Sequence, residues 1–323
     1  MTKSGRELVR DLVLLLAAAA AVAGCALQGK PTLADTGRVE FATAGSLVPG
    51  EAGRLVMRPP LTLSGELQTP RGSGPFPGVV LMHGCAGVGA AERGWESTLR
   101  TAGYATFLVD SFERRGLREA CVDPLALHPT QRIPDAYGAL QALSSHPAID
   151  ARRIALMGFS HGGIVTTQSA TKWAHDTFTE HGHPSFRAFV AFYPYCNWTF
   201  PEMAHLAGPL RIHSGALDDW TPAKPCERMV SALRAHGYDA RITVYPRARH
   251  SFDEVGLPPT VLPLVVNGAA CSPRLGSILG PLENAEEMGA CLRQGATIGW
   301  NRAATMQARA SVLEDLARFL QEP

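Results

Sequence analysis

A serine flanked by glycines directly after a short apolar run is the feature that most constrains the fold of this chain. The run covers residues 153–157, and Gly158-Phe159-Ser160-His161-Gly162 follows it at once. This order predicts a buried strand, a sharp turn and a helix, with Ser160 on the turn and its hydroxyl clear of the sheet. Glycine fits two residues on either side because larger side chains would collide there. A glycine-rich turn with a helix-capping serine is the plainer alternative.

Further short apolar runs alternate with segments of helical spacing. The runs cover residues 78–82, 104–109, 186–192, 210–213 and 240–245, and the helical segments cover 135–143 and 308–320. Short runs without polar alternation suit strands that are buried on both faces. The alternation predicts an α/β fold with a mostly parallel central sheet flanked by helices. In such sheets ligands bind beyond the carboxyl ends of the strands, so the residues that follow each run carry the information about function.

The residues after two later runs complete a possible catalytic set with Ser160. Asp218 follows the run at 210–213, and His250 follows the run at 240–245. A serine nucleophile needs a base, and the base needs an acid that orients it. The chain order of serine, acid and histidine is the one used by a nucleophile on a strand-to-helix turn. Taken singly, Asp218 could cap the next helix and His250 could be a surface loop residue.

Hydrolysis by a serine also needs two backbone N–H groups to hold the negative oxygen of the intermediate. We expect one from His161, the residue after the nucleophile, and one from Cys85, in the loop after the run at 78–82. Only the backbone is needed at these positions. The imidazoles of His83 and His161 are therefore interpreted as structural rather than catalytic.

The N-terminal residues read as an export signal. Lys3, Arg6 and Arg10 precede an uncharged apolar run, which ends in Val22-Ala23-Gly24-Cys25. The run is too short to span a bilayer, which takes about 20 residues. The four residues resemble a bacterial lipobox, so we expect residues 1–24 to be a lipoprotein signal peptide and Cys25 to be lipidated. No aspartate follows at positions 26 or 27, which favours the outer membrane of the cell envelope, facing the periplasm. An ordinary signal peptide with an incidental Cys25 is the alternative.

We assign residues 25–51 to a tether and 52–323 to one folded domain, which a chain of 323 residues can form. Residues 253–301 break the alternation and are expected to be an insertion held by a disulfide. Six cysteines besides Cys25 allow 15 pairings in an oxidising compartment. Because loops after consecutive strands often lie together, we expect sequential pairing, namely Cys85–Cys121, Cys196–Cys226 and Cys271–Cys291. A reduced, buried Cys85 is the alternative.

From about residue 53 onward the chain resembles the dienelactone hydrolase family of α/β-hydrolases. The resemblance rests on six motifs in the expected order: residues 81–87, Asp110-Ser-Phe112 with Arg115-Gly116, Gly158–Gly162, Phe192-Tyr-Pro194, Gly215-Ala-Leu-Asp218 with Pro222, and His250-Ser-Phe252. It implies a monomeric hydrolase of esters or lactones that needs no cofactor or metal, with the set Ser160, Asp218 and His250. The spacing from Gly215 to Pro222 favours Asp218 over Asp219, which is expected to face solvent or cap the helix near Pro222.

The chain departs from this family in its nucleophile. The founding enzymes use cysteine, so Ser160 puts dienelactone itself in doubt as the substrate and favours a general carboxylic ester. Arg114, Arg115 and Trp220 lie near motif residues and could line the pocket, where a guanidinium could hold an anionic substrate. Alternatively, the two arginines are solvated or hold their own loop.

Three rival functions can be weighed against the sequence. The same residues could serve acyl transfer or peptide hydrolysis. The chain could instead be an envelope lipoprotein that kept the fold as a binding module and lost its activity, although all three expected residues are present. Metal-assisted hydrolysis would need a ligand motif such as H-E-x-x-H, which does not occur. The net charge of +1 provides no basic excess for binding nucleic acid.

Overall fold

The structure is a computed structural model that describes residues 36–49, 55–124, 126–179 and 184–320. The expected signal peptide and the lipidation site Cys25 lie outside the described residues.

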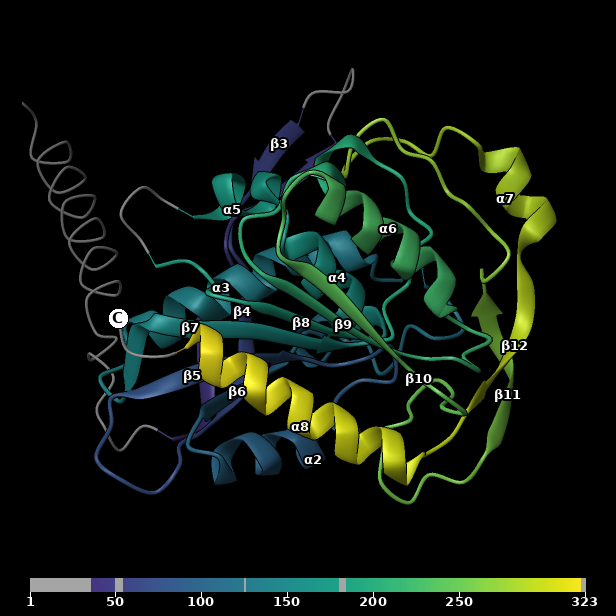
Figure 1. Cartoon of the computed structure of the whole chain (residues 1–323). Coiled ribbons are helices and arrows are strands. Elements are labelled where there is room, and N and C mark those ends of the chain that lie inside the picture. The colour runs from purple at the N-terminus through teal and green to yellow at the C-terminus, as the bar shows by residue number, and fades with distance from the viewer. Residues whose placement is uncertain (1–35, 50–54, 125, 180–183, 321–323) are drawn as a thin grey trace, which may run out of the picture.

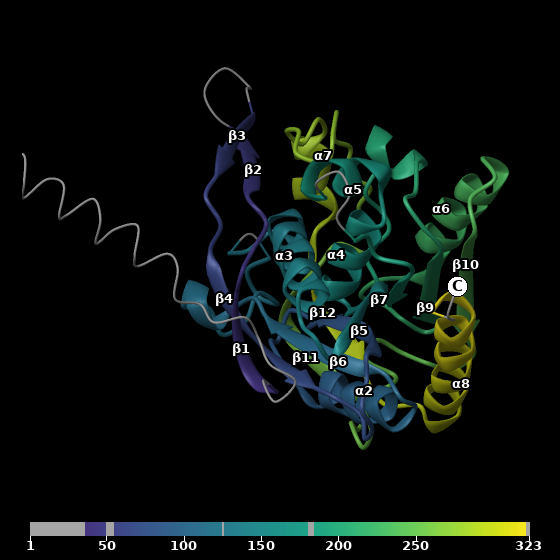
Figure 2. The ribbon, with the colours of Figure 1, turned by 90° about the vertical axis from the view of Figure 1, so that its left-hand side faces the viewer.

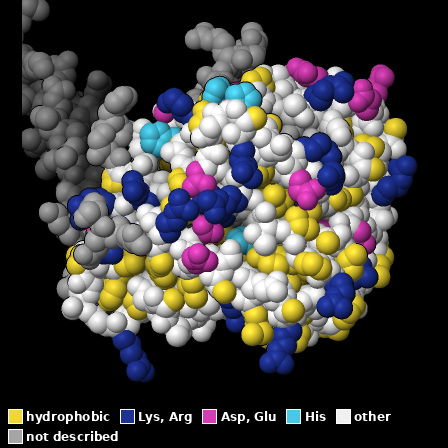
Figure 3. Space-filling view, viewed as in Figure 1, with side chains coloured by type: hydrophobic (Ala, Val, Ile, Leu, Met, Phe, Trp, Pro, Cys, Tyr) yellow, Lys and Arg dark blue, Asp and Glu magenta, His cyan; other side chains and the backbone are white. Residues whose placement is uncertain are grey.

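On the face shown in Figure 3, basic and acidic side chains are interspersed with apolar ones, in line with the small net charge.

An eight-stranded sheet forms the centre of the molecule (Figure 1). Its order is β1-β4-β6-β5-β7-β8-β9-β10. In this sheet order, all strands from β6 through β5 to β10 are parallel. Strand β4 runs antiparallel to β6, and β1 runs antiparallel to β4. Their bounds are β1 Gly37–Ala42, β4 Thr62–Gln68, β5 Phe76–Met82, β6 Ala105–Asp110, β7 Ile149–Phe159, β8 Phe189–Phe192, β9 Leu210–Gly215 and β10 Ala240–Tyr245. The predicted α/β architecture with a mostly parallel sheet is confirmed.

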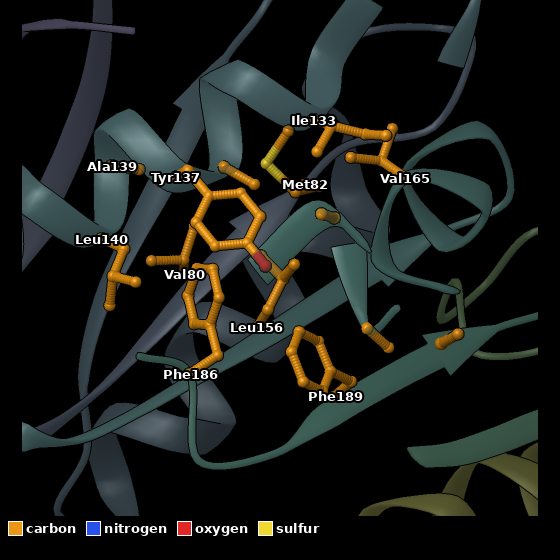
Figure 4. Packing of buried hydrophobic residues seen from close by; sticks show 14 of the residues in the cluster. Val80, Met82, Ile133, Tyr137, Ala139, Leu140, Leu156, Val165, Phe186 and Phe189 are labelled. Carbon is orange, nitrogen blue, oxygen red and sulfur yellow. The ribbon is translucent and has the colours of Figure 1, made fainter. Parts of the chain in front are cut away.

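Helices cover both faces of the sheet (Figure 2). One face packs against α3 Ile133–Ser144, α4 His161–Ser169 and α6 Ala223–Ala235, and α5 Lys172–Phe178 lies beside α3 and α4. The other face packs against α2 Ala90–Thr101 and α8 Arg302–Phe319. Successive residues of β5 explain both cores, because Val80 and Met82 point to the first and Val79 and Leu81 to the second. Figure 4 shows the first core, in which Val80 and Leu156 pack against Tyr137 and Phe186.

Two small hairpins stand outside the main sheet. Near the N-terminus, β2 Ser46–Pro49 pairs with β3 Leu55–Arg58. After His250, β11 Thr260–Asn267 pairs with β12 Arg293–Ile298, and the helix α7 Ala285–Cys291 lies between them. The expected insertion at 253–301 therefore contains its own hairpin, and the Cys271–Cys291 disulfide closes the segment between the two strands.

The start of the folded part differs from the sequence assignment. Residues 37–42, which we assigned to the tether, form β1 and pair with β4 along six positions at the edge of the sheet. Only Phe41 of this strand is buried, so its apolar pattern is too weak to stand out in the sequence. The sheet, rather than the composition, sets this boundary.

In the described residues, 3₁₀ turns occur in the loops at Glu113–Arg115, Pro129–Arg132 and Pro201–Ala204. Across the described ranges, no helix has both the length and the apolar character that crossing a membrane requires.

Candidate active site

Ser160 stands on a strained turn between β7 and α4. Its φ is 50° and its ψ is −111°, a backbone conformation that residues other than glycine rarely adopt. The two glycines around it leave no room for a methyl group. A Cβ at Gly158 would lie 2.1 Å from the carbonyl oxygen of Gly162, and a Cβ at Gly162 would lie 2.1 Å from that of Met82. The expected collision therefore explains both glycines. Ser160 itself is half-buried and lies at the carboxyl end of the sheet.

The three residues expected as a catalytic set lie in hydrogen-bond contact. His250 Nε2 is 2.9 Å from Ser160 Oγ, and His250 Nδ1 is 2.9 Å from Asp218 Oδ2. Ser160 follows β7, Asp218 follows β9 and His250 follows β10, so parallel strands bring them to one edge. Asp218 accepts further hydrogen bonds from the N–H groups of Trp220 and Thr221, which fix the direction of its carboxylate.

Aromatic rings hold the imidazole of His250, which is buried. The ring centroid of Tyr193 lies 4.5 Å away and that of Trp220 lies 4.9 Å away. Tyr193 is itself fixed, because its hydroxyl donates to Asp253 at 2.7 Å. Trp95 Nε1 donates to the other oxygen of Asp253, also at 2.7 Å. The orientation of His250 is therefore fixed by the rings of Tyr193 and Trp220, and Asp253 in turn fixes Tyr193. Of the three residues expected to line the pocket, Trp220 lies beside the imidazole.

The loop after β5 lies against the turn that carries Ser160. A Cβ at Gly84 would lie 3.7 Å from the Cβ of Ser160. Most backbone groups of this loop are already paired. The carbonyl of Cys85 accepts from Ala120, that of Gly84 accepts from Gly87, and the N–H of Gly84 donates to Glu92. Among the described residues, the N–H groups of Cys85 and His161 donate to no acceptor. The sequence analysis expects these two N–H groups to hold the oxygen of the intermediate, and neither is used within the described part of the protein.

The imidazoles of His83 and His161 serve the structure of this loop. Both are buried, and burial lowers their pKa values well below the ordinary histidine range, so both rings are neutral. Ser111 N–H donates to His83 Nε2 at 3.2 Å, while His83 Nδ1 lies 2.7 Å from the carbonyl of Gly84. His161 Nε2 lies 2.9 Å from the carbonyl of Leu127. Neither ring contacts the hydroxyl of Ser160.

The six cysteines pair in the order that the sequence analysis expected. The structure contains the disulfides Cys85–Cys121, Cys196–Cys226 and Cys271–Cys291, with Cα separations of 5.0, 5.0 and 5.3 Å. These separations lie within the ordinary range for disulfides. The first bond links the loop after β5 to the loop after β6, and the second links the loop after β8 to α6.

Arg114 and Arg115 have protein partners instead of a place at the expected catalytic triad of Ser160, Asp218 and His250. The exposed Arg114 forms an ion pair with Glu40 of β1. Arg115 binds both oxygens of the buried Asp135, at 2.8 and 2.9 Å, and donates to the carbonyl of Ser111. Because both guanidiniums are held in this way, the expectation that they bind an anionic substrate gains no support from these contacts.

Asp219 has a role that the sequence did not suggest. Its carboxylate is exposed, as expected, but it accepts from the N–H and the hydroxyl of Thr297 in β12, both at 2.8 Å. It does not cap α6. The hairpin is joined to the same region elsewhere, because Asn267 donates to the carbonyl of Asp219 and Trp220 Nε1 to that of Val266. Gly299 N–H also donates to the carbonyl of His250, so the hairpin is bonded both to the loop that carries Asp218 and to the loop that carries His250.

Sequence reasoning missed two buried charged residues next to the site. Glu92, in the first turn of α2, accepts from the N–H groups of Gly84 and Gly89, and burial raises the pKa of its carboxyl. Arg132 donates to the carbonyl of His83. A glutamate at the third helical position was a usable capping signal. A single arginine ahead of a helix gave no comparable signal.

Within the described residues, no cluster of histidine, cysteine or acidic side chains has the arrangement of a metal site. The groups that meet at this edge of the sheet are the hydroxyl of Ser160, the imidazole of His250 and the carboxylate of Asp218.

Comparisons with known proteins agree with this fold. A curated relative from Bradyrhizobium, named "Probable 2-oxo-3-(5-oxofuran-2-ylidene)propanoate lactonase", is 22% identical over 204 residues, which cover 58% of this chain and 78% of the relative. The solved structure of Thermogutta terrifontis esterase 2 is 13% identical with a TM-score of 0.54, covering 87% of this chain and 97% of that one. The dienelactone hydrolase-like phosphotriesterase P91 from metagenomic libraries is 16% identical with a TM-score of 0.51, covering 88% and 99%.

A family model matches the part of the chain that carries the site. It is described as the dienelactone hydrolase family, and it covers residues 63–258, from β4 to just beyond His250. The match includes Ser160, Asp218 and His250, and it ends before the hairpin of β11 and β12. The chain belongs to the dienelactone hydrolase family and is an α/β hydrolase of the ester- and lactone-cleaving kind.

Proposed function

We propose that the chain is a serine hydrolase that cleaves carboxylic esters or lactones through Ser160, Asp218 and His250. The observation that carries the proposal is the placement of His250 between the other two, at 2.9 Å from each. Distances in this range are what a general base and its orienting acid require. The family and its lactonase relative support this substrate class.

The reaction follows from these contacts. His250 takes the proton from Ser160 Oγ as the oxygen attacks the substrate carbonyl, and Asp218 stabilises the imidazolium that forms. The N–H groups of Cys85 and His161 hold the negative carbonyl oxygen of the tetrahedral intermediate. His250 then gives the proton to the leaving alkoxide, which leaves an acyl-enzyme on Ser160. A water molecule, deprotonated by His250, hydrolyses that ester and releases the acid.

The same steps would serve a lactone, in which the alkoxide that leaves the carbonyl remains part of the acyl group, so that water releases a single hydroxy acid from Ser160. Serine also distinguishes this site from the cysteine of the founding enzymes. A serine hydroxyl depends fully on its base for activation, whereas a cysteine thiol is partly ionised on its own. A serine in place of the cysteine favours ordinary carboxylic esters over dienelactone as substrates. The base that Ser160 needs is His250, whose Nε2 lies 2.9 Å from the hydroxyl oxygen.

Labelling with a fluorophosphonate probe tests the proposal directly. One related esterase, that of Thermogutta terrifontis, is phosphoramylated by tabun. We expect the purified chain to be labelled and to hydrolyse p-nitrophenyl esters, and Ser160→Ala to lose both properties. Labelling that persists in Ser160→Ala would assign the nucleophile elsewhere. A folded chain that neither labels nor hydrolyses graded esters and lactones would favour the idle binding module.

A further inference from the structure

Arg132 is a buried charge that the triad does not explain. It ends the 3₁₀ turn before α3, and its side chain is fully buried. Burial lowers the pKa of its guanidinium to about 10, so the group is charged at neutral pH. The nearby carboxylate of Asp135 is occupied by Arg115, and Arg132 forms no ion pair with any described residue. Burying a cation without a direct ion pair is unfavourable for folding, so a plain packing role is a poor explanation.

One nitrogen of Arg132 joins the two halves of the expected oxyanion hole. Nη1 donates to the carbonyl of His83 at 3.0 Å and to His161 Nδ1 at 2.8 Å. The first contact lies on the loop that carries Cys85, and the second is the side chain of the other donor residue. The two segments also touch directly, because a Cβ at Gly162 would lie 2.6 Å from the same carbonyl of His83.

This contact fixes the ring of His161. Since a guanidinium can only donate, His161 Nδ1 must accept, and the ring proton is on Nε2. That N–H then donates to the carbonyl of Leu127 at 2.9 Å. The ring is thus held at both nitrogens, and its backbone N–H begins α4 with no partner in that helix.

The other nitrogens of Arg132 leave its charge only partly used. Nε and Nη2 are buried and have no hydrogen-bond partner in the described residues. The guanidinium also lies over the ring of Phe112, 5.3 Å from its centroid. The charge interacts at a distance with the carboxylates of Asp135, Glu92 and Asp110, but none of them pairs with it directly. A buried positive charge without a direct ion pair, close to the loops that carry Cys85 and His161, is suited to act on a negative charge that develops nearby.

We propose that Arg132 is a positioning residue for the oxyanion hole, which holds its two donor segments together and favours negative charge between them. The inference rests on the proposed hydrolase function. It assigns Arg132 no direct contact with substrate, because the side chain is fully buried. Replacing Arg132 should therefore lower kcat, which reports on the transition state, and change KM little.

The variants Arg132→Met and Arg132→Lys test this, with Arg211→Met as a matched control. Arg211 is also a buried arginine, but it pairs with Asp239 and Asp315 away from the site. We expect Arg132→Met to lower kcat about 10- to 100-fold, less than the roughly 10²- to 10³-fold lost when an oxyanion donor itself is removed, with KM changed less than about threefold. Affinity for a trifluoromethyl ketone, which forms a negatively charged adduct with serine, should fall in step with kcat/KM.

The control and the lysine variant keep the test decisive. Arg211→Met should lower Tm and leave kcat near the wild-type value. Arg132→Lys keeps a charge but loses the planar geometry, so its kcat should fall between wild type and Arg132→Met. If Arg132→Met is too unstable to assay, an Arg132→Lys variant with wild-type kcat and inhibitor affinity overturns the inference. A folded Arg132→Met with unchanged kcat also overturns it. Failure of the hydrolase proposal is distinguishable, because wild type would then lack activity that depends on Ser160.

Discussion

Asp218 and Asp219 show how two identical side chains next to each other take different roles. Asp218 is buried and contacts His250 Nδ1, whereas Asp219 is exposed and binds Thr297 of the hairpin. The backbone turns between them, so their carboxylates point to opposite partners. The difference follows from the loop conformation, and it predicts different effects of the same substitution.

Asp218→Asn should lower kcat by about 10⁴-fold, because an amide favours the wrong imidazole tautomer. Asp219→Asn should keep most of the activity and lower Tm slightly, because it weakens the contact with Thr297. Steady-state kinetics of both variants with one ester substrate, beside thermal unfolding, provide the measurement. A larger loss of kcat in Asp219→Asn than in Asp218→Asn would reverse the assignment of the acid.

The residues that sequence reasoning found are those with local patterns. Ser160, Asp218 and His250 each follow an apolar run, so position along the chain was enough to select them. Arg132 could not be found in this way, because its importance comes from a carbonyl 49 residues away. The contact between Asp219 and Thr297 joins residues 78 apart, and no periodicity links them.

At the scale of elements, the loop after β5 is held in place by a disulfide bond. The Cys85–Cys121 bond attaches it to the loop after β6, and Ala120 N–H donates to the carbonyl of Cys85 beside that bond. In the same loop, Glu92 accepts from the N–H of Gly84 and Arg132 donates to the carbonyl of His83. The disulfide thus fixes the residue whose N–H we propose as an oxyanion donor.

We expect the double variant Cys85→Ser/Cys121→Ser to lose activity before it loses its fold. Serine keeps the backbone N–H but frees the loop, so kcat should fall about tenfold while the far-UV circular dichroism stays native. The matched control is Cys271→Ser/Cys291→Ser, which removes a crosslink in the hairpin and should keep kcat within about twofold of wild type. Equal kcat values in the two double variants would show that the Cys85–Cys121 bond does not support the oxyanion loop.

The central strands were predictable from the sequence and the edge of the sheet was not. The strands β5, β6 and β8 are almost entirely buried and appear as apolar runs, and β7 does so from residue 154 onward. Strand β9 is also buried, although its sequence includes Arg211 and His213. In contrast, β1 alternates exposed and half-buried residues, and β11 lies outside the main sheet with Val261 and Leu264 exposed. Elements that gain their pairing from distant partners give weak signals in the sequence.

For the whole molecule, we propose attachment to the cell envelope through Cys25. The motive is the sequence Val22-Ala23-Gly24-Cys25 after a short apolar run, and three disulfides in the folded part suit an oxidising compartment. Cys25→Ser should move the protein from the membrane fraction to the soluble fraction, as detected by immunoblotting after fractionation. Membrane association that persists in Cys25→Ser would contradict lipid anchorage.

The hairpin of β11 and β12 has a consequence for how bulky substrates reach Ser160. Its hydrogen bonds to Asp219, Trp220 and the carbonyl of His250 tie it to the same loops that carry the acid and the base. Swinging it aside would disturb the triad, so it is unsuited to serve as a lipase-type lid that opens at an oil–water boundary. Hydrolysis of a sparingly soluble ester should accordingly show no jump in rate as the substrate passes from single molecules to micelles.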